Sequence, residues 1–244
     1  MIDGKRVLII MPALNEAAGV AEVIKEVNST LTGADVLVVD DGSTDDTSAV
    51  ARTTGATVMR LPYNLGVGGA MRAGYKFALD RGYDVAVQVD ADGQHDPRDV
   101  PGLLARLDEG ADLVMGARFA GTGEYRTRGP RRWAMLVLAF WLSRLARTRL
   151  TDVTSGFRAC RGDLIRVFAR WYPAEYLGDT VESTIAAIRA GYRVEQVPVS
   201  MRPRLTGTPS QSPWKATLYL GRIGMILLLA FSRGSSLGLQ QKGK

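Results

Sequence analysis

Asp90 and Asp92 place two carboxylates one residue apart, and the side-chain amide of Gln94 follows two positions later. Oxygen atoms are the ligands that Mg²⁺ and Mn²⁺ prefer, and a site with few protein ligands leaves coordination positions for phosphate oxygens. The spacing therefore indicates a divalent-cation site that could bind a phosphorylated ligand. An Asp-x-Asp pair also arises by chance in many chains, so its surroundings decide what it means.

Three other polar clusters follow apolar runs, at residues 12–16, 40–43 and 64–70. Asp41, in the second cluster, could accept hydrogen bonds from a base or a ribose. Glycines in the third cluster allow the backbone to approach a ligand closely. This glycine run is a poor dinucleotide fingerprint, because an acidic residue should end a second strand about 20 positions later, whereas Asp84 begins one.

The elements that must position these clusters alternate between strands and helices. We expect buried strands at residues 7–11, 36–39, 56–61, 85–89 and 113–115. We expect helices at residues 17–31, after 43, at 70–80 and at 97–107, with Ser43 or Thr44 capping the second and Pro97 starting the last. Repeated β-α units predict an α/β fold with a mostly parallel sheet, and ligands bind such sheets at the carboxyl ends of the strands. All four clusters fall at those ends.

The net charge of +6 is the average of two unlike halves. Residues 1–125 carry 11 Lys and Arg against 19 Asp and Glu, whereas residues 126–244 carry 20 against 6. An acidic half beside a basic half favours a metal site next to an anion-binding or membrane-facing surface. The composition, 46% hydrophobic and 23% charged, excludes a disordered chain. The single cysteine, Cys160, excludes an internal disulfide framework, and no signal-peptide pattern opens the sequence, so we expect a cytoplasmic location.

Five motifs occur in order along the chain: PALNE, VVDDGS, NLGVGGA, DADGQH and TSGFR, the last at Thr154–Arg158. Over roughly residues 5–207 this set resembles the family-2 inverting glycosyltransferases, and among them the polyprenyl-phosphate sugar synthases. The resemblance implies a GT-A fold with a Rossmann-like, mostly parallel sheet. It also implies Mg²⁺- or Mn²⁺-dependent transfer of a hexose from a nucleotide diphosphate sugar, of the GDP-mannose or UDP-glucose type, to polyprenyl or dolichyl phosphate. We expect a catalytic domain at residues 1–207 and a docking segment at 208–244.

The resemblance also assigns roles to residues by position. The nucleoside would be held by Pro12, Leu14, Glu16, Val39 and Asp41. The metal would be held by Asp90, Asp92 and Gln94, and the diphosphate by the same residues with Ala91. Arg118 and Arg204 would contact the donor phosphates. The relatives often carry a lysine after Arg-x-x-Gly-x-Ser, and this chain lacks it after Arg204.

Seven arginines surround an apolar segment at residues 133–142. They are Arg126, Arg128, Arg131, Arg132, Arg144, Arg147 and Arg149. One interpretation is a buried helix with solvated basic ends. The other is an interfacial helix whose arginines meet lipid phosphates while Trp133, Phe140 and Trp141 enter the headgroup boundary.

Ten uncharged residues form about 15 Å of helix, too short for a hydrocarbon core of roughly 30 Å. A second short apolar run, at residues 223–232, lies between Arg222 and Arg233. We therefore expect basic C-terminal interfacial helices and a peripheral position on the cytoplasmic face of a membrane, with a separate membrane protein as anchor. Nucleic acid is not expected, because the arginines lie beside apolar helices rather than between stacking aromatic residues.

The acceptor decides the mechanism. A phosphate monoester has a second pKa of about 6, so at neutral pH it needs positioning rather than a general base. Arg118, Arg128 and either Arg131 or Arg132 are the candidates for positioning it. A hydroxyl acceptor would need a base, and Asp179 with Glu182 is the pair to consider. These two could instead form a helix capping box.

In the family resembled, Ser155 and Arg158 lie near the acceptor, together with Asp152. A turn held by an Asp152–Arg158 ion pair is the structural alternative. His95 is expected to support the metal site through a hydrogen bond rather than to act in catalysis. A catalytically idle nucleotide-sugar-binding subunit is the remaining possibility, and the intact Asp90–Gln94 cluster argues against it.

Overall fold

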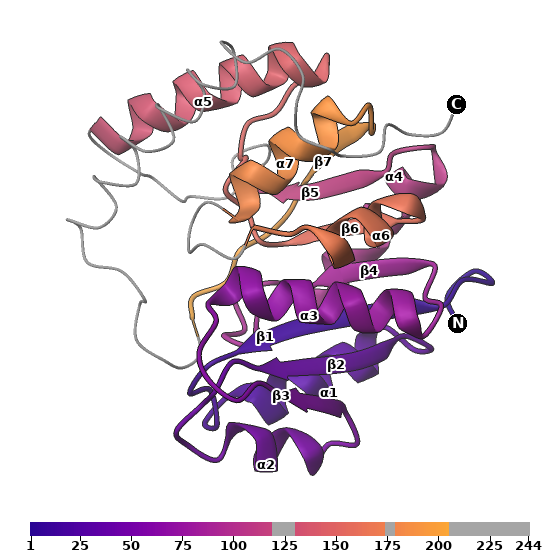
Figure 1. The fold of residues 1–244 in the computed structure, drawn as a ribbon, viewed down its shortest axis with the longest axis vertical. Coiled ribbons are helices and arrows are strands. Elements are labelled where there is room, and N and C mark those ends of the chain that lie inside the picture. The colour runs from indigo at the N-terminus through magenta and orange to yellow at the C-terminus, as the bar shows by residue number, and fades with distance from the viewer. Residues whose placement is uncertain (119–129, 174–178, 205–244) are drawn as a thin grey trace.

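A computed structural model describes residues 1–118, 130–173 and 179–204, with only the backbone for residues 130–137. Its centre is one seven-stranded sheet (Figure 1). The strands are β1 (Val7–Ala13), β2 (Asp35–Asp40), β3 (Thr57–Arg60), β4 (Val85–Gln88), β5 (Leu113–Ala117), β6 (Arg158–Arg161) and β7 (Val194–Pro198). Their order across the sheet is β3-β2-β1-β4-β6-β5-β7, and only β6 runs antiparallel to its neighbours. The mostly parallel sheet expected from the sequence is confirmed.

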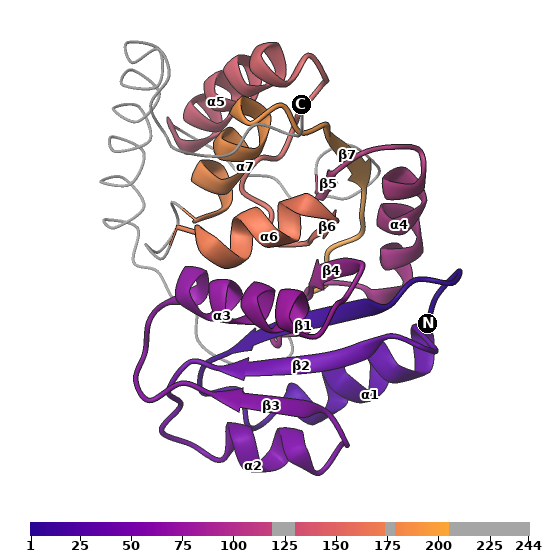
Figure 2. The same ribbon diagram turned by 45° about the vertical axis from the view of Figure 1, so that its right-hand side comes forward.

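Helices cover both faces of this sheet (Figure 2). They are α1 (Val20–Thr30), α2 (Thr47–Arg52), α3 (Val67–Asp80), α4 (Val100–Asp108), α5 (Pro130–Ala146), α6 (Asp163–Arg170) and α7 (Asp179–Arg189), with a 3-10 turn at Pro97–Asp99 leading into α4. One buried core contains residues of α3, α6 and α7, and the other contains residues of α1 and α4. α3 and α6 lie side by side in both views.

Strand β1 explains why both faces are covered. Leu8 and Ile10 belong to the core beneath α3, whereas Val7, Ile9 and Met11 belong to the core beneath α1. Successive side chains of a strand point to opposite faces, so a continuous apolar run needs helices on both sides. Helix α3 lies so close to the sheet that a Cβ atom at Gly74 would be 2.4 Å from a methyl carbon of Ile10. A glycine is therefore required at that position.

The start of the second helix differs from the sequence prediction. Helix α2 begins at Thr47, and neither Ser43 nor Thr44 caps it. The Ser43 hydroxyl instead accepts a hydrogen bond from the backbone N–H of Asn15, at 2.9 Å. Ser43 has a side chain that could cap a helix, but its hydroxyl oxygen is bound to the loop after β1 instead. The predicted start at Pro97 is confirmed, with Asp96 accepting a hydrogen bond from the N–H of Arg98.

Helix α5 lies at one end of the molecule, away from β1–β3 (Figure 1). Within the described ranges, we find no helix with the length and apolarity needed to span a bilayer. The second apolar run, at residues 223–232, and the rest of the expected docking segment at 208–244 lie outside the described residues.

Candidate functional site

The loops after β1 and β2 are tied together by hydrogen bonds. Asn15 adopts a left-handed conformation, with φ of 56°, and its side-chain oxygen accepts a hydrogen bond from Thr44 N at 2.8 Å. The N–H of Glu16 donates to the Thr47 hydroxyl at 2.9 Å. These contacts leave Leu14 40% exposed at the edge of the sheet. The first two sequence clusters thus form one surface.

Asp40 and Asp41 are adjacent but have different environments. Asp40 is fully buried and accepts hydrogen bonds from Ser43 N and the Ser48 hydroxyl, which makes it a structural residue. The carboxylate of Asp41 accepts a hydrogen bond from Leu65 N at 2.7 Å, at the start of the glycine-rich cluster. Burial raises the pKa of Asp41, and backbone donors partly oppose that shift. The residue assigned to the nucleoside therefore joins the second and third clusters.

The remaining nucleoside candidates lie beside Asp41. Pro12 of β1 is in register with Val39 of β2, and Val39 is fully buried in the sheet. Glu16 is partly exposed in the loop after β1. Pro12 and Val39 thus lie within the sheet near this edge, whereas Leu14 and Glu16 lie in the loop after β1.

Asp90 and Asp92 follow β4 directly, and neighbouring groups orient both. Gln88 Nε2 donates to Asp90 Oδ1 at 3.0 Å, and Gln94 N donates to Asp92 Oδ1 at 3.0 Å. His95 Nδ1 accepts a hydrogen bond from Asp90 N, and the buried ring stacks on Phe157. Ala91 is buried between the two carboxylates. His95 therefore supports the Asp90 backbone, in line with the supporting role expected from the sequence.

The two carboxylates fit a hard divalent cation. The pKa of Asp92 is raised by burial and by the nearby charge of Asp90, so a cation is electrostatically favourable there. A guanidinium nitrogen of Arg204 already lies 2.9 Å from Asp92 Oδ2. A Cβ atom at position 156 would be 2.9 Å from Gln88 Nε2, so Gly156 leaves room for the amide that donates to Asp90. In the described part of the chain, no cluster of three or more His, Cys, Asp or Glu side chains could hold a metal. Two carboxylates would need oxygens from a ligand or water to complete the coordination.

Arg118, at the end of β5, is held by Asp152. Its Nε and Nη2 atoms donate to the two carboxylate oxygens of Asp152 at 2.5 and 2.9 Å, and Nη2 also donates to Thr154 Oγ1. Asp152 is fully buried, while a fifth of the Arg118 side chain is exposed. The Asp152–Arg158 ion pair offered as the structural alternative is therefore wrong, because Asp152 pairs with Arg118. Sequence spacing carried no signal of this pair, which joins two loops.

Arg158 lies beneath the surface. It is fully buried, and its two terminal nitrogens donate to Ser183 Oγ at 2.9 Å and to Ser155 O at 2.8 Å. Ser155 is buried as well. Because both side chains are buried, their position favours a structural role near the acceptor over direct contact with the acceptor.

Asp179 is the first residue of α7 and faces the same region. Its side chain is buried, and burial raises its pKa to about 6, with Arg158 opposing the shift and the charge of Asp90 adding to it. Asp179 Oδ2 has no hydrogen-bond partner among the described atoms. Glu182 lies in the first turn of α7. A carboxylate in this state could exchange a proton near neutral pH.

The side chains of the predicted acceptor-binding arginines lie outside the part of the chain that the structure describes. Arg128 lies outside the described residues, as does Arg126. Arg131 and Arg132 lie in the first turn of α5, where only the backbone is described. Their predicted roles stay predictions.

Comparison with known proteins gives a consistent family. A family model described as glycosyl transferase family 2 matches residues 8–169. A polyprenol monophosphomannose synthase of Mycolicibacterium smegmatis is 34% identical, with 85% of this chain and 82% of that protein covered. An undecaprenyl-phosphate mannosyltransferase of Micrococcus luteus is 35% identical, with 85% and 88% covered.

The fold also matches solved structures. Glucosyl-3-phosphoglycerate synthase from Mycobacterium tuberculosis, in complex with Mn²⁺, uridine diphosphate and phosphoglyceric acid, superposes with a TM-score of 0.71. The sequences are 22% identical, and the match covers 96% of this chain and 81% of the other. The same enzyme with Mg²⁺ and uridine diphosphate gives a TM-score of 0.70 at 24% identity, with 96% and 82% covered. At such identities the likeness shows the fold, which confirms the expected GT-A architecture.

Proposed function

Because this chain belongs to glycosyl transferase family 2, we propose that it transfers a hexose, with inversion, from a nucleotide diphosphate sugar to a polyprenyl phosphate. The observation that carries the proposal is the placement of these carboxylates at one edge of the sheet: Asp41 follows β2, and Asp90 and Asp92 follow β4, with Arg204 ion-paired to Asp92. The two mannosyl-transferring relatives support polyprenyl phosphate as the acceptor and mannose as the hexose. GDP-mannose is therefore the first donor to test and UDP-glucose the second.

In this proposal the donor lies along the strand ends from β2 to β4. Asp41 binds the nucleoside together with Pro12, Leu14, Glu16 and Val39. Asp90, Asp92 and Gln94 would hold Mg²⁺ or Mn²⁺, which would neutralise negative charge on the departing diphosphate. Arg204 and Arg118 contribute further positive charge next to the phosphates.

The phosphate acceptor attacks the anomeric carbon directly. It is largely dianionic at neutral pH and needs no proton acceptor, so this chain must position it. Arg118 is the described residue suited to this task, since Asp152 fixes its guanidinium while part of the side chain stays exposed. Arg128, with Arg131 or Arg132, would bind the same phosphate from the start of α5.

A second candidate is transfer to a hydroxyl of a glycan or small molecule. The observation that favours it is the buried Asp179, whose pKa is raised to about 6, at the end of α7 nearest Asp90. Asp179 would then accept the hydroxyl proton. An idle nucleotide-sugar-binding subunit is a weaker candidate, because two oriented carboxylates have no use in a scaffold.

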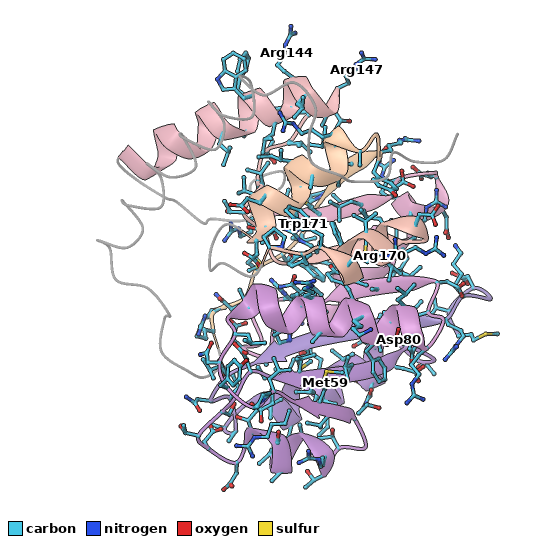
Figure 3. All side chains as sticks on the ribbon, in the orientation of Figure 1. Met59, Asp80, Arg144, Arg147, Arg170 and Trp171 are labelled. Atoms are coloured by element: carbon cyan, nitrogen blue, oxygen red, sulfur yellow. The ribbon has the colours of Figure 1, made fainter. Side chains whose placement is uncertain are left out.

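The outer face of α5 supports a membrane-surface location. Phe140, Trp141 and Leu145 are exposed, whereas Leu138 and Leu142 are buried against the rest of the protein. Arg144 and Arg147 point away from the body of the molecule beside this face (Figure 3). We infer that α5 lies on the cytoplasmic face of an anionic membrane, where a separate membrane protein could add an anchor.

A competition assay tests the acceptor. The purified protein is incubated with labelled GDP-mannose or UDP-glucose, Mn²⁺, a short-chain polyprenyl phosphate and the matching polyprenol. We expect the labelled sugar to be transferred to the polyprenyl phosphate, and we expect no transfer when the metal is chelated. Label on the polyprenol alone would favour the hydroxyl candidate, and no transfer from any nucleotide sugar in a broad panel would contradict both.

A further inference from the structure

The chain that leaves β7 runs back to the metal-site carboxylates. We call residues Val199–Arg204 the β7 extension. It lies antiparallel to the segment after Asp92: His95 and Met201 form a β-bridge, and Arg202 N donates to Gln94 O at 3.0 Å. Ser200 N donates to Asp99 Oδ2 at 2.8 Å. The backbone of the extension is thus fixed beside residues 94–99.

The side chain of Arg202 adds a second anchor. Its Nη1 atom donates to both carboxylate oxygens of Glu26 in α1, at 2.7 and 2.8 Å. Its Nη2 atom lies 2.7 Å from Asp96 Oδ1. Arg98 and Arg202 together hold the pKa of Asp96 well below its usual value. One guanidinium therefore joins the extension, helix α1 and the turn before α4.

This anchor lies two residues from Arg204, whose guanidinium is 2.9 Å from Asp92 Oδ2. An extended chain advances about 3.3 Å per residue, so the backbone of Arg204 lies within about 7 Å of the backbone of Arg202. Fixing Arg202 therefore restricts the positions that Arg204 can reach. Arg202 itself points to Glu26 and Asp96, and within the described contacts it does not touch Asp90 or Asp92.

We propose that Arg202 is a positioning residue, which sets the approach of Arg204 to Asp92 and to the diphosphate of the donor. This inference rests on the proposed function, in which Arg204 binds donor phosphates. Loss of the Arg202 anchor lets Arg204 sample positions away from the diphosphate. Because small misplacements of a binding group are costly, we expect about a tenfold loss of nucleotide affinity.

The experiment compares Arg202→Met, which keeps the apolar stem, with Arg202→Lys. Arg98→Met is the matched control, because Arg98 shares the partner Asp96 but has a 72% exposed side chain and, among the described contacts, none with the extension. Calorimetry measures the binding of GDP or UDP, whichever the wild type binds more tightly, in the presence of Mn²⁺. Thermal unfolding and the KM values for donor and acceptor are measured alongside.

Arg202→Met should weaken nucleotide binding and raise donor KM about tenfold, while acceptor KM and the unfolding midpoint stay close to wild type. Arg202→Lys should recover part of the loss, and Arg98→Met should remain within twofold of wild type. Glu26→Gln removes the carboxylate that binds Arg202 and should raise donor KM in the same direction but by a smaller factor. In an Arg204→Met background, Arg202→Met should add nothing further.

Two results would overturn the inference alone: donor binding unchanged in Arg202→Met, or a full additional loss in the Arg204→Met background. If Arg202→Met unfolds, unchanged donor binding in Glu26→Gln overturns it instead. Failure of the wild-type protein to bind either nucleotide with Mn²⁺ overturns the proposed function, and the inference falls with it.

Discussion

Arg118 and Asp152 form a two-point ion pair that joins the end of β5 to the loop before β6, with nitrogen–oxygen distances of 2.5 and 2.9 Å. Gln196 of β7 completes the connection by donating to Asp152 O at 2.6 Å. Planar guanidinium and carboxylate groups paired in this way restrict each other's orientation. The arginine proposed to bind phosphate is therefore held by Asp152, whose backbone is in turn held by β7.

Asp152→Asn tests this orientation. The substitution keeps the shape of the side chain but removes the charge that Arg118 faces. Because Asp152 is fully buried, we expect a loss of about 1–3 kcal/mol in the free energy of unfolding. The loss of kcat/KM should exceed tenfold, because Arg118 would no longer be fixed. Denaturant unfolding and steady-state kinetics check both values, and unchanged kinetics in a folded variant would remove Arg118 from the phosphate site.

Asp92→Asn tests the metal assignment. The variant should fold normally, because removing one of two neighbouring carboxylates relieves repulsion at Asp90. Metal-dependent turnover should fall by at least about a hundredfold, and Mn²⁺ binding measured by electron paramagnetic resonance should weaken in parallel. Asp46→Asn, at an exposed aspartate that makes no side-chain cap, is the control. Wild-type turnover in Asp92→Asn would refute the assignment.

Asp179→Asn separates the two acceptor types. With a phosphate acceptor no base is needed, so turnover should fall less than about tenfold. With a hydroxyl acceptor, loss of the base should cost about 10²–10⁴-fold. Turnover is measured with polyprenyl phosphate and with a hydroxyl acceptor in parallel, and a loss in the larger range with polyprenyl phosphate would contradict base-free transfer to the phosphate.

The same variant should change how stability depends on pH. Burial raises the pKa of Asp179 to about 6 from 3.8, so the folded state retains its proton to higher pH than the unfolded state does. Folding stability from this group is therefore greatest below about pH 4 and declines as the pH rises to about 6, by at most about 3 kcal/mol.

Urea unfolding of wild type and Asp179→Asn across this window isolates the contribution, because Asp41, Asp92 and Asp96 titrate in both proteins. The difference in stability should shift in favour of the variant as the pH rises. A difference that is constant with pH would show that Asp179 has an ordinary pKa.

Reversing the charges of Arg144 in α5 and of Arg147, just past the end of this helix, tests the membrane surface. Arg144→Glu with Arg147→Glu should weaken binding to vesicles containing anionic lipid by at least about tenfold, since each basic residue near such a surface contributes about 1 kcal/mol. Arg52→Glu, in the distant α2, should bind like wild type (Figure 1). Sedimentation with vesicles measures the effect, and a wild type that ignores anionic vesicles would contradict the proposed location.

The parallel part of the sheet and its four polar clusters could be predicted, because short continuous apolar runs and the turn residues that follow them are local signals. Three tertiary contacts could not be predicted from the sequence. Arg118 and Asp152 are far apart in sequence, and so are the buried Arg158 and Ser183, which accepts a hydrogen bond from its guanidinium. Ser43 had the chemistry of a helix cap, but Asn15 from another loop competed for its oxygen. In each case tertiary contacts decided between choices that the local sequence left open.

The anomeric configuration and linkage of the product give the most direct test of the central claim. The purified protein is supplied with GDP-mannose, Mn²⁺ and a short-chain polyprenyl phosphate, and the product is analysed by nuclear magnetic resonance and by mild acid treatment. The proposed function predicts an acid-labile glycosyl phosphate whose anomeric configuration is opposite to that of the donor. An acid-stable glycoside, or a glycosyl phosphate that retains the donor configuration, would contradict it.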